Sequence, residues 1–127
     1  MIDRFHHVQV RTTDLEKSLA FYRDTLGWSV TRTWGGNGEA SGAILSGGGV
    51  KVVVTGDGKA ASPSSANGPI VFLDIHDIDK RFKALPKGNH VVTPPGPTAW
   101  GTRWFVVKDP DGNQIAFEEV HGFHDRG

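Results

Sequence analysis

The chain contains the same helix start twice, and this internal repeat limits its possible folds more than any other feature. Residues 14–17 are DLEK, and residues 77–80, at an offset of 63, are DIDK. In both copies an Asp suited to capping a helix follows a β-rich run, residues 5–11 and residues 70–75. The repeat predicts two modules of one α+β fold, each a strand, a helix and three further strands.

The first module is expected at residues 3–56. Its helix has apolar residues at steps of four, three and four, which form one helical face: Leu15, Leu19, Tyr22 and Leu26. Gly27 suits a left-handed helix end. Strands are predicted at residues 28–34, 40–45 and 50–55, with glycine-rich turns between them.

The second module is expected at residues 69–120, after a linker of Gly, Ser, Ala and Pro at residues 57–68. Its later strands are predicted at residues 90–93, 104–107 and 114–119, with a proline-rich loop at 94–97 and a tight turn at 109–113. Neither module can bury both faces of its own sheet. Two copies can do so if their curved sheets face each other, either around a filled core or around a ligand cavity.

Composition excludes several classes of protein. The 127 residues fit a single domain, and 14 basic against 14 acidic residues leave no positive excess for nucleic acid. There is no cysteine for disulfides or thiolate metal sites, and no apolar run of the roughly 20 residues that a membrane helix needs. Residues 1–5 lack the apolar core of a secretory signal, so a cytoplasmic protein with no membrane partner is expected.

Two stretches carry a resemblance to a known family. Residues 14–28 are DLEKSLAFYRDTLGW, preceded by HVQV at 7–10, and residues 105–115 are FVVKDPDGNQI. They resemble the vicinal oxygen chelate superfamily, which comprises glyoxalase, bleomycin-resistance and extradiol dioxygenase proteins. The WGTRW of residues 100–104 is similar to its bleomycin-resistance branch. The resemblance implies two βαβββ modules enclosing a cavity, and a homodimer whose cavities often use strands of both subunits.

The resemblance also implies where a divalent metal would bind in the metalloenzymes of this superfamily. The ligands are a His seven residues before the first capping Asp, a His or Gln at the equivalent position of the second module, and a Glu four residues after the DPDG glycine. This chain has His7, Ile70 and Ala116 at those positions. Because such metal sites use about three protein ligands and two of these side chains are hydrocarbon, we expect no metal cofactor and no metal-dependent glyoxalase I activity.

Strand alternation predicts which side chains line the cavity instead. Aromatic surfaces for stacking and a few polar groups are expected on the inward faces, and they suit a small aromatic or amphipathic ligand. The predicted ligand-binding residues are His7, Gln9, Arg11, Phe72, Asp74, Trp100, Trp104, Gln114 and Glu118. Trp34 is a further candidate.

Plainer interpretations stay open at this point. His7 could be satisfied by Glu118, Arg11 could pair with Asp74 or Glu118, and Phe72 with Trp104 could fill a core. An enzyme is a second possibility, in which His7 or Glu118 is the general base of a lyase or isomerase. A displaced metal bound by the same two residues could also act, in a dioxygenase-like enzyme for example. A third is an interaction module that keeps the fold and has a closed pocket.

Overall fold

The computed structural model describes residues 1–36, 39–56 and 69–119. The chain divides into two compact units, Met1–Pro63 and Ser64–Gly127, which we call unit 1 and unit 2 and describe separately. The expected linker at residues 57–68 lies outside the described residues. None of the helices in the described ranges is long and apolar enough to cross a bilayer.

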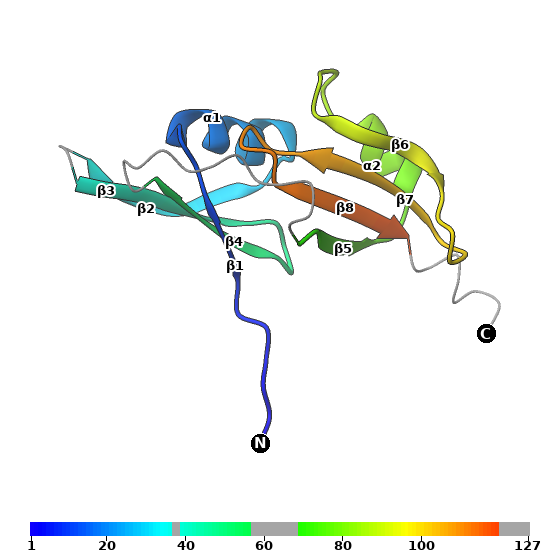
Figure 1. Ribbon diagram of the computed structural model, residues 1–127, viewed down its shortest axis with the longest axis horizontal. Helices are drawn as coiled ribbons and strands as arrows, with labels where there is room; N and C mark the ends of the chain where they lie inside the picture. Colours follow the sequence, from blue (N-terminus) through cyan, green and yellow to red (C-terminus); the bar gives the residue numbers. More distant parts are fainter. Residues whose placement is uncertain (37–38, 57–68, 120–127) are drawn as a thin grey trace. The chain divides into compact units, whose positions relative to one another are not determined.

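Unit 1 holds a four-stranded mixed sheet with a helical segment (Figure 1). Its elements are β1 (Val8–Arg11), α1 (Leu15–Leu19), the π-helical turn η1 (Ala20–Thr25), β2 (Ser29–Gly36), β3 (Glu39–Ser46) and β4 (Lys51–Gly56). The strand order is β1-β4-β3-β2, with β1 parallel to β4. The strand β1 begins at Val8, three residues later than the run predicted at residues 5–11.

Unit 2 repeats this plan with the same topology. Its elements are β5 (Val71–Ile75), α2 (Ile78–Lys83), β6 (Val91–Pro97), β7 (Arg103–Lys108) and β8 (Gln114–Glu119). The strand order is β5-β8-β7-β6, with β5 parallel to β8. Because both units consist of a strand, a helical segment and three further strands, the predicted pair of tandem βαβββ modules is confirmed.

Both helices start with the same cap, as the repeat predicts. The side chain of Asp14 accepts a hydrogen bond from the Lys17 amide at 3.2 Å, and that of Asp77 accepts one from the Lys80 amide at 3.1 Å. Each satisfies one of the amides that lack a partner in the first turn of a helix. The duplicated Asp thus has the same structural role in both units.

The helix of unit 1 changes its hydrogen bonding after one turn. The Leu26 amide donates to the Phe21 carbonyl at 2.9 Å, a bond to the fifth residue back rather than the fourth. Two neighbouring aromatic residues of this turn, Phe21 and Tyr22, are both buried. Steps of four, three and four predict one face of Leu15, Leu19, Tyr22 and Leu26. The last three are buried and Leu15 is half-buried, and the steps do not predict the wider turn.

In unit 1 the core lies on one face of the sheet. The register pairs Leu45 with Val52 and Ala43 with Val54, and all four side chains are buried. The segment α1 packs against β3 and β4. In β1, Val8 and Val10 project to the core face, whereas Gln9 and Arg11 project to the other face and are exposed.

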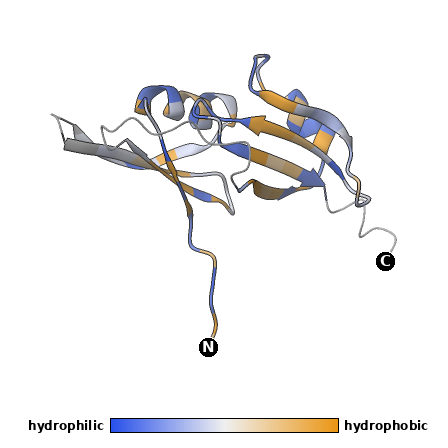
Figure 2. Ribbon diagram, in the orientation of Figure 1, coloured by the Kyte–Doolittle hydropathy of each residue, from blue (hydrophilic) through white to orange (hydrophobic). Residues whose placement is uncertain are grey.

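In unit 2 the core is aromatic and lies between the sheet and α2. Phe105 and Phe117, register partners on β7 and β8, stack with ring centroids 4.7 Å apart, and Phe82 of α2 meets Phe105 edge-on at 5.2 Å. Ile78, the first residue of α2, is fully buried. Figure 2 shows hydrophobic residues along β5 and β7, whereas much of α2 is hydrophilic.

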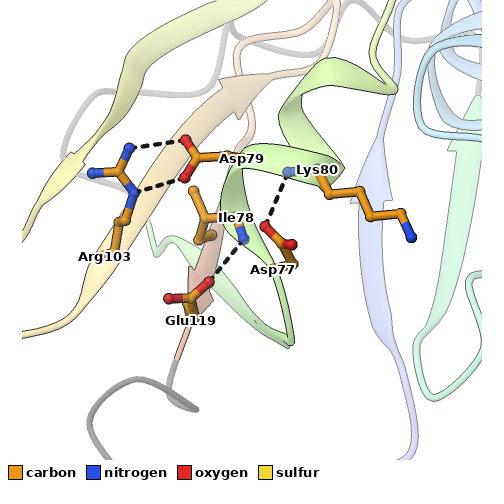
Figure 3. Close-up of polar contacts among 6 residues, drawn as sticks. All are labelled: Asp77, Ile78, Asp79, Lys80, Arg103 and Glu119. Atoms are coloured by element: carbon orange, nitrogen blue, oxygen red, sulfur yellow. Dashed lines mark hydrogen bonds and ion pairs between the residues drawn. The ribbon is translucent and has the colours of Figure 1, made fainter.

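Polar side chains from β7 and β8 hold the beginning of α2 (Figure 3). Glu119 Oε1 accepts a hydrogen bond from the Ile78 amide at 3.0 Å, and Arg103 donates to both carboxylate oxygens of Asp79 at 2.8 and 3.2 Å. The hydrogen bond from Arg103 lowers the pKa of the Asp79 carboxyl below its ordinary value. Arg103 and Glu119 therefore belong to the face of the sheet that α2 covers.

The strand β6 extends further than its sequence indicates. The proline-rich loop predicted at residues 94–97 is the second half of this strand, in which Gly96 pairs with Trp104 after a shift of register. Proline has no amide to donate to a sheet, so it is tolerated in an edge strand, and β6 is the edge of its sheet.

Candidate aromatic site on unit 2

The register of unit 2 defines a sheet face that α2 does not cover. Partners that lie side by side on neighbouring strands project to the same side of a sheet. Two such rows cross β5, β8 and β7: Phe72–Ala116–Val106 and Asp74–Glu118–Trp104. Arg103, Phe105 and Phe117, which contact α2, have the opposite parity. We call the side with the two rows the open face of unit 2, meaning only that it is turned away from α2: Phe72 and Asp74 are exposed on it, whereas Ala116 and Val106 are buried.

Three aromatic rings form a cluster on this open face. Phe72 and Trp104 are nearly parallel, with centroids 6.0 Å apart, and Trp100 meets Trp104 edge-on at 5.4 Å and lies 6.4 Å from Phe72. These separations lie within the range of favourable ring contacts. Phe72 and Trp100 are nevertheless 46% and 54% exposed. We call these three residues the aromatic cluster; its rings contact one another and keep accessible surface.

A carboxylate is held at the border of the aromatic cluster. Glu118 Oε2 accepts hydrogen bonds from Trp100 Nε1 at 2.5 Å and from Thr102 Oγ1 at 2.6 Å. Short bonds to a carboxylate are stronger than neutral ones. Glu118 therefore ties the indole of Trp100 to β8.

The position of Trp100 depends on the hairpin between β6 and β7. Thr98 Oγ1 accepts a hydrogen bond from the Thr102 amide and lies 2.9 Å from Thr102 Oγ1, while the Thr98 amide donates to the Thr102 carbonyl at 2.8 Å. Gly101 has a φ of 97°, in the left-handed region that glycine adopts without strain. This tight turn places Trp100 at its tip, from which the indole reaches Trp104.

Asp74 lies next to Glu118 as its Cα partner across β5 and β8. Asp74 is exposed. Among the residues that the structure describes, none forms a hydrogen bond or an ion pair with its carboxylate. Gln114 projects to the same side at the opposite end of β8, where Lys108 is its partner.

Unit 1 has an uncovered face of its own, with a different character. Gln9 and Arg11 lie on it, and the Gln9 amide donates to Thr55 Oγ1 at 3.4 Å. The indole of Trp34 lies directly over Gly42, its register partner, and a Cβ at that glycine would collide with the ring. This face therefore combines polar side chains with one indole.

His7 lies one residue before β1, so strand alternation does not define its direction. Its Nδ1 is 2.6 Å from Nδ1 of His6, and the two rings meet edge-on. Both side chains are exposed. The predicted pairings are of His7 with Glu118 and of Arg11 with Asp74 or Glu118. Each would connect residues of different units, so these pairings, like the placement of His7 in a cavity, stay predictions.

Strand alternation correctly placed Phe72, Asp74, Trp104 and Glu118 on one side of unit 2. It missed two residues that position the site, Thr98 and Thr102, although their spacing around Gly101 is a signal for a hydroxyl-stabilised turn. It also missed Arg32, which pairs with Ile44 and so shares the uncovered face of unit 1 with Trp34. Alternation from Trp34 is a signal for Arg32, because the register runs without a shift between the two residues.

The chain thus consists of two consecutive βαβββ units. In each unit, the helix covers one face of the sheet. The sequence-family model of the Glyoxalase/Bleomycin resistance protein/Dioxygenase superfamily matches residues 4–117 of this chain. The chain belongs to this superfamily, as the resemblance indicates.

Several solved structures have folds similar to that of this chain. The trypanothione-dependent glyoxalase I of Leishmania major is 21% identical with a TM-score of 0.72, covering 98% of this chain and 92% of its own. A superfamily member from Sphaerobacter thermophilus is 27% identical (TM-score 0.68; 93% and 98% covered), and TioX from Micromonospora sp. ML1 is 25% identical (TM-score 0.66; 91% and 98% covered). No curated protein matches the chain.

At two of the three metal-ligand positions that the resemblance implies, the side chains are hydrocarbon. Ala116 lies on the open face of unit 2 between Phe72 and Val106, where its methyl group has no lone pair to donate. Ile70 is two residues before Phe72 and is likewise hydrocarbon. Within the described ranges, no group of three or more His, Asp or Glu residues is arranged to hold a metal ion.

Proposed function

We propose that this protein binds a small, flat aromatic or amphipathic molecule on the open face of unit 2, without the divalent metal of its metalloenzyme relatives. The observation that carries this proposal is the aromatic cluster, in which Phe72 and Trp100 stay about half exposed although both contact another ring. Exposed aromatic surface bordered by polar groups is characteristic of ligand sites.

The polar groups around the aromatic cluster suit the orientation of a ligand. Glu118 uses Oε2 to hold Trp100 and Thr102. Its other carboxylate oxygen accepts no hydrogen bond from any residue that the structure describes. A ring system stacked on the cluster could therefore donate a hydrogen bond to Oε1 without disturbing the contacts that position the site.

The absence of a metal is part of the proposal and rests on side-chain chemistry. Of the three ligand positions that the resemblance implies, only His7 carries a donor atom, and a single imidazole with water does not retain a divalent ion. We expect substoichiometric metal in protein purified without added metal. We also expect no turnover of the methylglyoxal–glutathione adduct.

Binding is tested by isothermal titration against a panel of aromatic metabolites and antibiotics, followed by the variants Trp100→Ala and Phe5→Ala. Phe5 is 73% exposed and precedes β1, so it controls for the loss of an exposed aromatic side chain. We expect Trp100→Ala to weaken binding about tenfold, since stacking and the anchoring hydrogen bond are both lost, and Phe5→Ala to leave it unchanged. A panel without a single binder would refute the proposal.

The proposed absence of a divalent metal is tested by elemental analysis of the wild type and of the double variant Ile70→His with Ala116→Glu. The variant restores donor atoms at both hydrocarbon positions, so we expect it to retain more zinc than the wild type. Tightly held stoichiometric metal in the wild type would contradict the metal-free proposal and favour the enzyme with a displaced metal site.

Self-association is a separate proposal that follows from membership of the superfamily. We expect a homodimer, and light scattering coupled to size-exclusion chromatography measures it directly. A monomer at concentrations of about 100 µM would contradict this expectation and leave the ligand proposal standing.

A further inference from the structure

We infer that the open face of unit 2 selects ligands that carry a positive charge beside a flat ring system. The inference rests on the proposed function and goes further, because it names the charge of the ligand. It follows from the arrangement of two carboxylates and three aromatic rings on one side of one sheet.

The two carboxylates lie in one row of the sheet. Asp74 and Glu118 are Cα partners on β5 and β8, and the next residue of that row, on β7, is Trp104. Like charges on directly opposed residues destabilise a sheet unless a cation lies between them. A cationic ligand would relieve that repulsion, whereas an anionic ligand would increase it.

No side chain of the row supplies such a cation. Lys108 shares the open face but lies beside Gln114, four residues along β8 from Glu118, which is about 13 Å away in an extended strand. Arg103 pairs with Asp79 on the covered face. His76 is two residues beyond Asp74, after the end of β5, and so lies outside the row.

The aromatic cluster favours the same sign of charge. A cation near the face of an indole or phenyl ring is attracted by the electrons of that face, and Trp is the strongest partner. Trp100 donates its Nε1 hydrogen to Glu118, so this indole is fixed beside the carboxylate. Carboxylates and ring faces thus act together on one positively charged nitrogen, while the uncharged part of the ligand stacks on the remaining aromatic surface.

Three probes with one ring system and different charges test the inference. They are N-methylacridinium, acridine and acridine-9-carboxylate, titrated calorimetrically into the full chain at about pH 8, where acridine is neutral. We expect N-methylacridinium to bind about tenfold more tightly than acridine, and acridine-9-carboxylate to bind most weakly.

Matched variants assign the preference to particular residues. Asp74→Asn and Glu118→Gln remove one charge each with little change of shape, and both should reduce the affinity for N-methylacridinium severalfold, by a larger factor than the affinity for neutral acridine. Asp74→Asn keeps the test valid if Glu118→Gln unfolds the hairpin, because no described contact depends on the Asp74 carboxylate. Glu16→Gln, on the exposed surface of α1, makes the same change of net charge and should have no effect.

The outcomes separate the two proposals. Equal or tighter binding of acridine or its carboxylate would overturn the charge preference and leave the aromatic site supported. An equal effect of Glu16→Gln would overturn it too, because the overall charge of the protein would then explain the result. Failure of all three probes also overturns it, whereas the proposed function fails only if the wider aromatic panel contains no binder.

Discussion

Glu118 and Glu119 are neighbours in β8 that face opposite sides of the sheet, so their alanine variants should separate binding from stability. Glu119 points to the covered face and accepts a hydrogen bond from the Ile78 amide at 3.0 Å (Figure 3). Glu118 points to the open face and holds Trp100 and Thr102. We expect Glu119→Ala to reduce stability and Glu118→Ala to reduce ligand affinity.

The cost of Glu119→Ala can be estimated from the contact that is lost. A side chain that accepts from an amide at the start of a helix stabilises a protein by about 1 kcal/mol. Asp77 still caps the Lys80 amide in the variant, so α2 keeps its other start signal. A loss of about 1 kcal/mol corresponds to a decrease in Tm of about 4 °C for a chain of this size.

Glu118→Ala loses two hydrogen bonds but should cost less stability. Trp100 is 54% exposed, so water can replace the carboxylate at Nε1, and Thr102 Oγ1 keeps its contact with Thr98 at 2.9 Å. We expect a loss below about 1 kcal/mol. Aromatic ligands should nevertheless bind about tenfold more weakly, because Trp100 is no longer held and the orienting carboxylate is gone.

Thermal unfolding followed by circular dichroism, and calorimetric titration with the tightest binder of the aromatic panel, measure the two effects on the same samples. The reasoning is refuted if Glu119→Ala weakens binding as much as Glu118→Ala does. It is also refuted if Glu118→Ala leaves binding intact and is the more destabilising of the two.

Three further predictions concern the framework of the site. Arg103→Gln should raise the pKa of Asp79 towards its ordinary value, which NMR titration measures. In the wild type, the stabilisation from this pair is present above the ordinary pKa of Asp and is lost as the pH falls through the lowered pKa of Asp79. Gly42→Ala should cost about 1–3 kcal/mol in urea unfolding because the new Cβ meets the overlying indole, whereas Gly49→Ala, with open space around the Cβ, should cost far less. Ile78→Ala should cost about 3 kcal/mol in the same assay, since the side chain is fully buried.

Local patterns predicted much of the fold because they depend on few neighbours. The repeated Asp predicted both helix starts, and hydrogen bonds of Asp109 with Asn113 and Gly112 form the turn expected at residues 109–113. Patterns failed where pairing decides the structure. The prolines of β6 resemble a loop in sequence, yet an edge position lets them continue a strand.

The candidate site was predictable in part for the same reason. Alternation along β5, β7 and β8 is a property of each strand, so it predicts a common side for Phe72, Trp104 and Glu118 once these strands share a sheet. Trp100 lies in the hairpin and has no such parity. Its contact with Trp104 and its hydrogen bond to Glu118 depend on the turn that Thr98 and Thr102 stabilise.

The sequence by itself determined that two modules of one plan follow each other and where their helices begin. These conclusions need only spacing and the period of a strand or helix, whereas the hydrocarbon side chains of Ile70 and Ala116 bear on a metal only through the family resemblance. The tertiary structure decided that β8 lies between β5 and β7, which brings Asp74 beside Glu118 and stacks Phe72 on Trp104. Residues more than 30 positions apart meet only through the order of strands in a sheet, and no local pattern specifies that order.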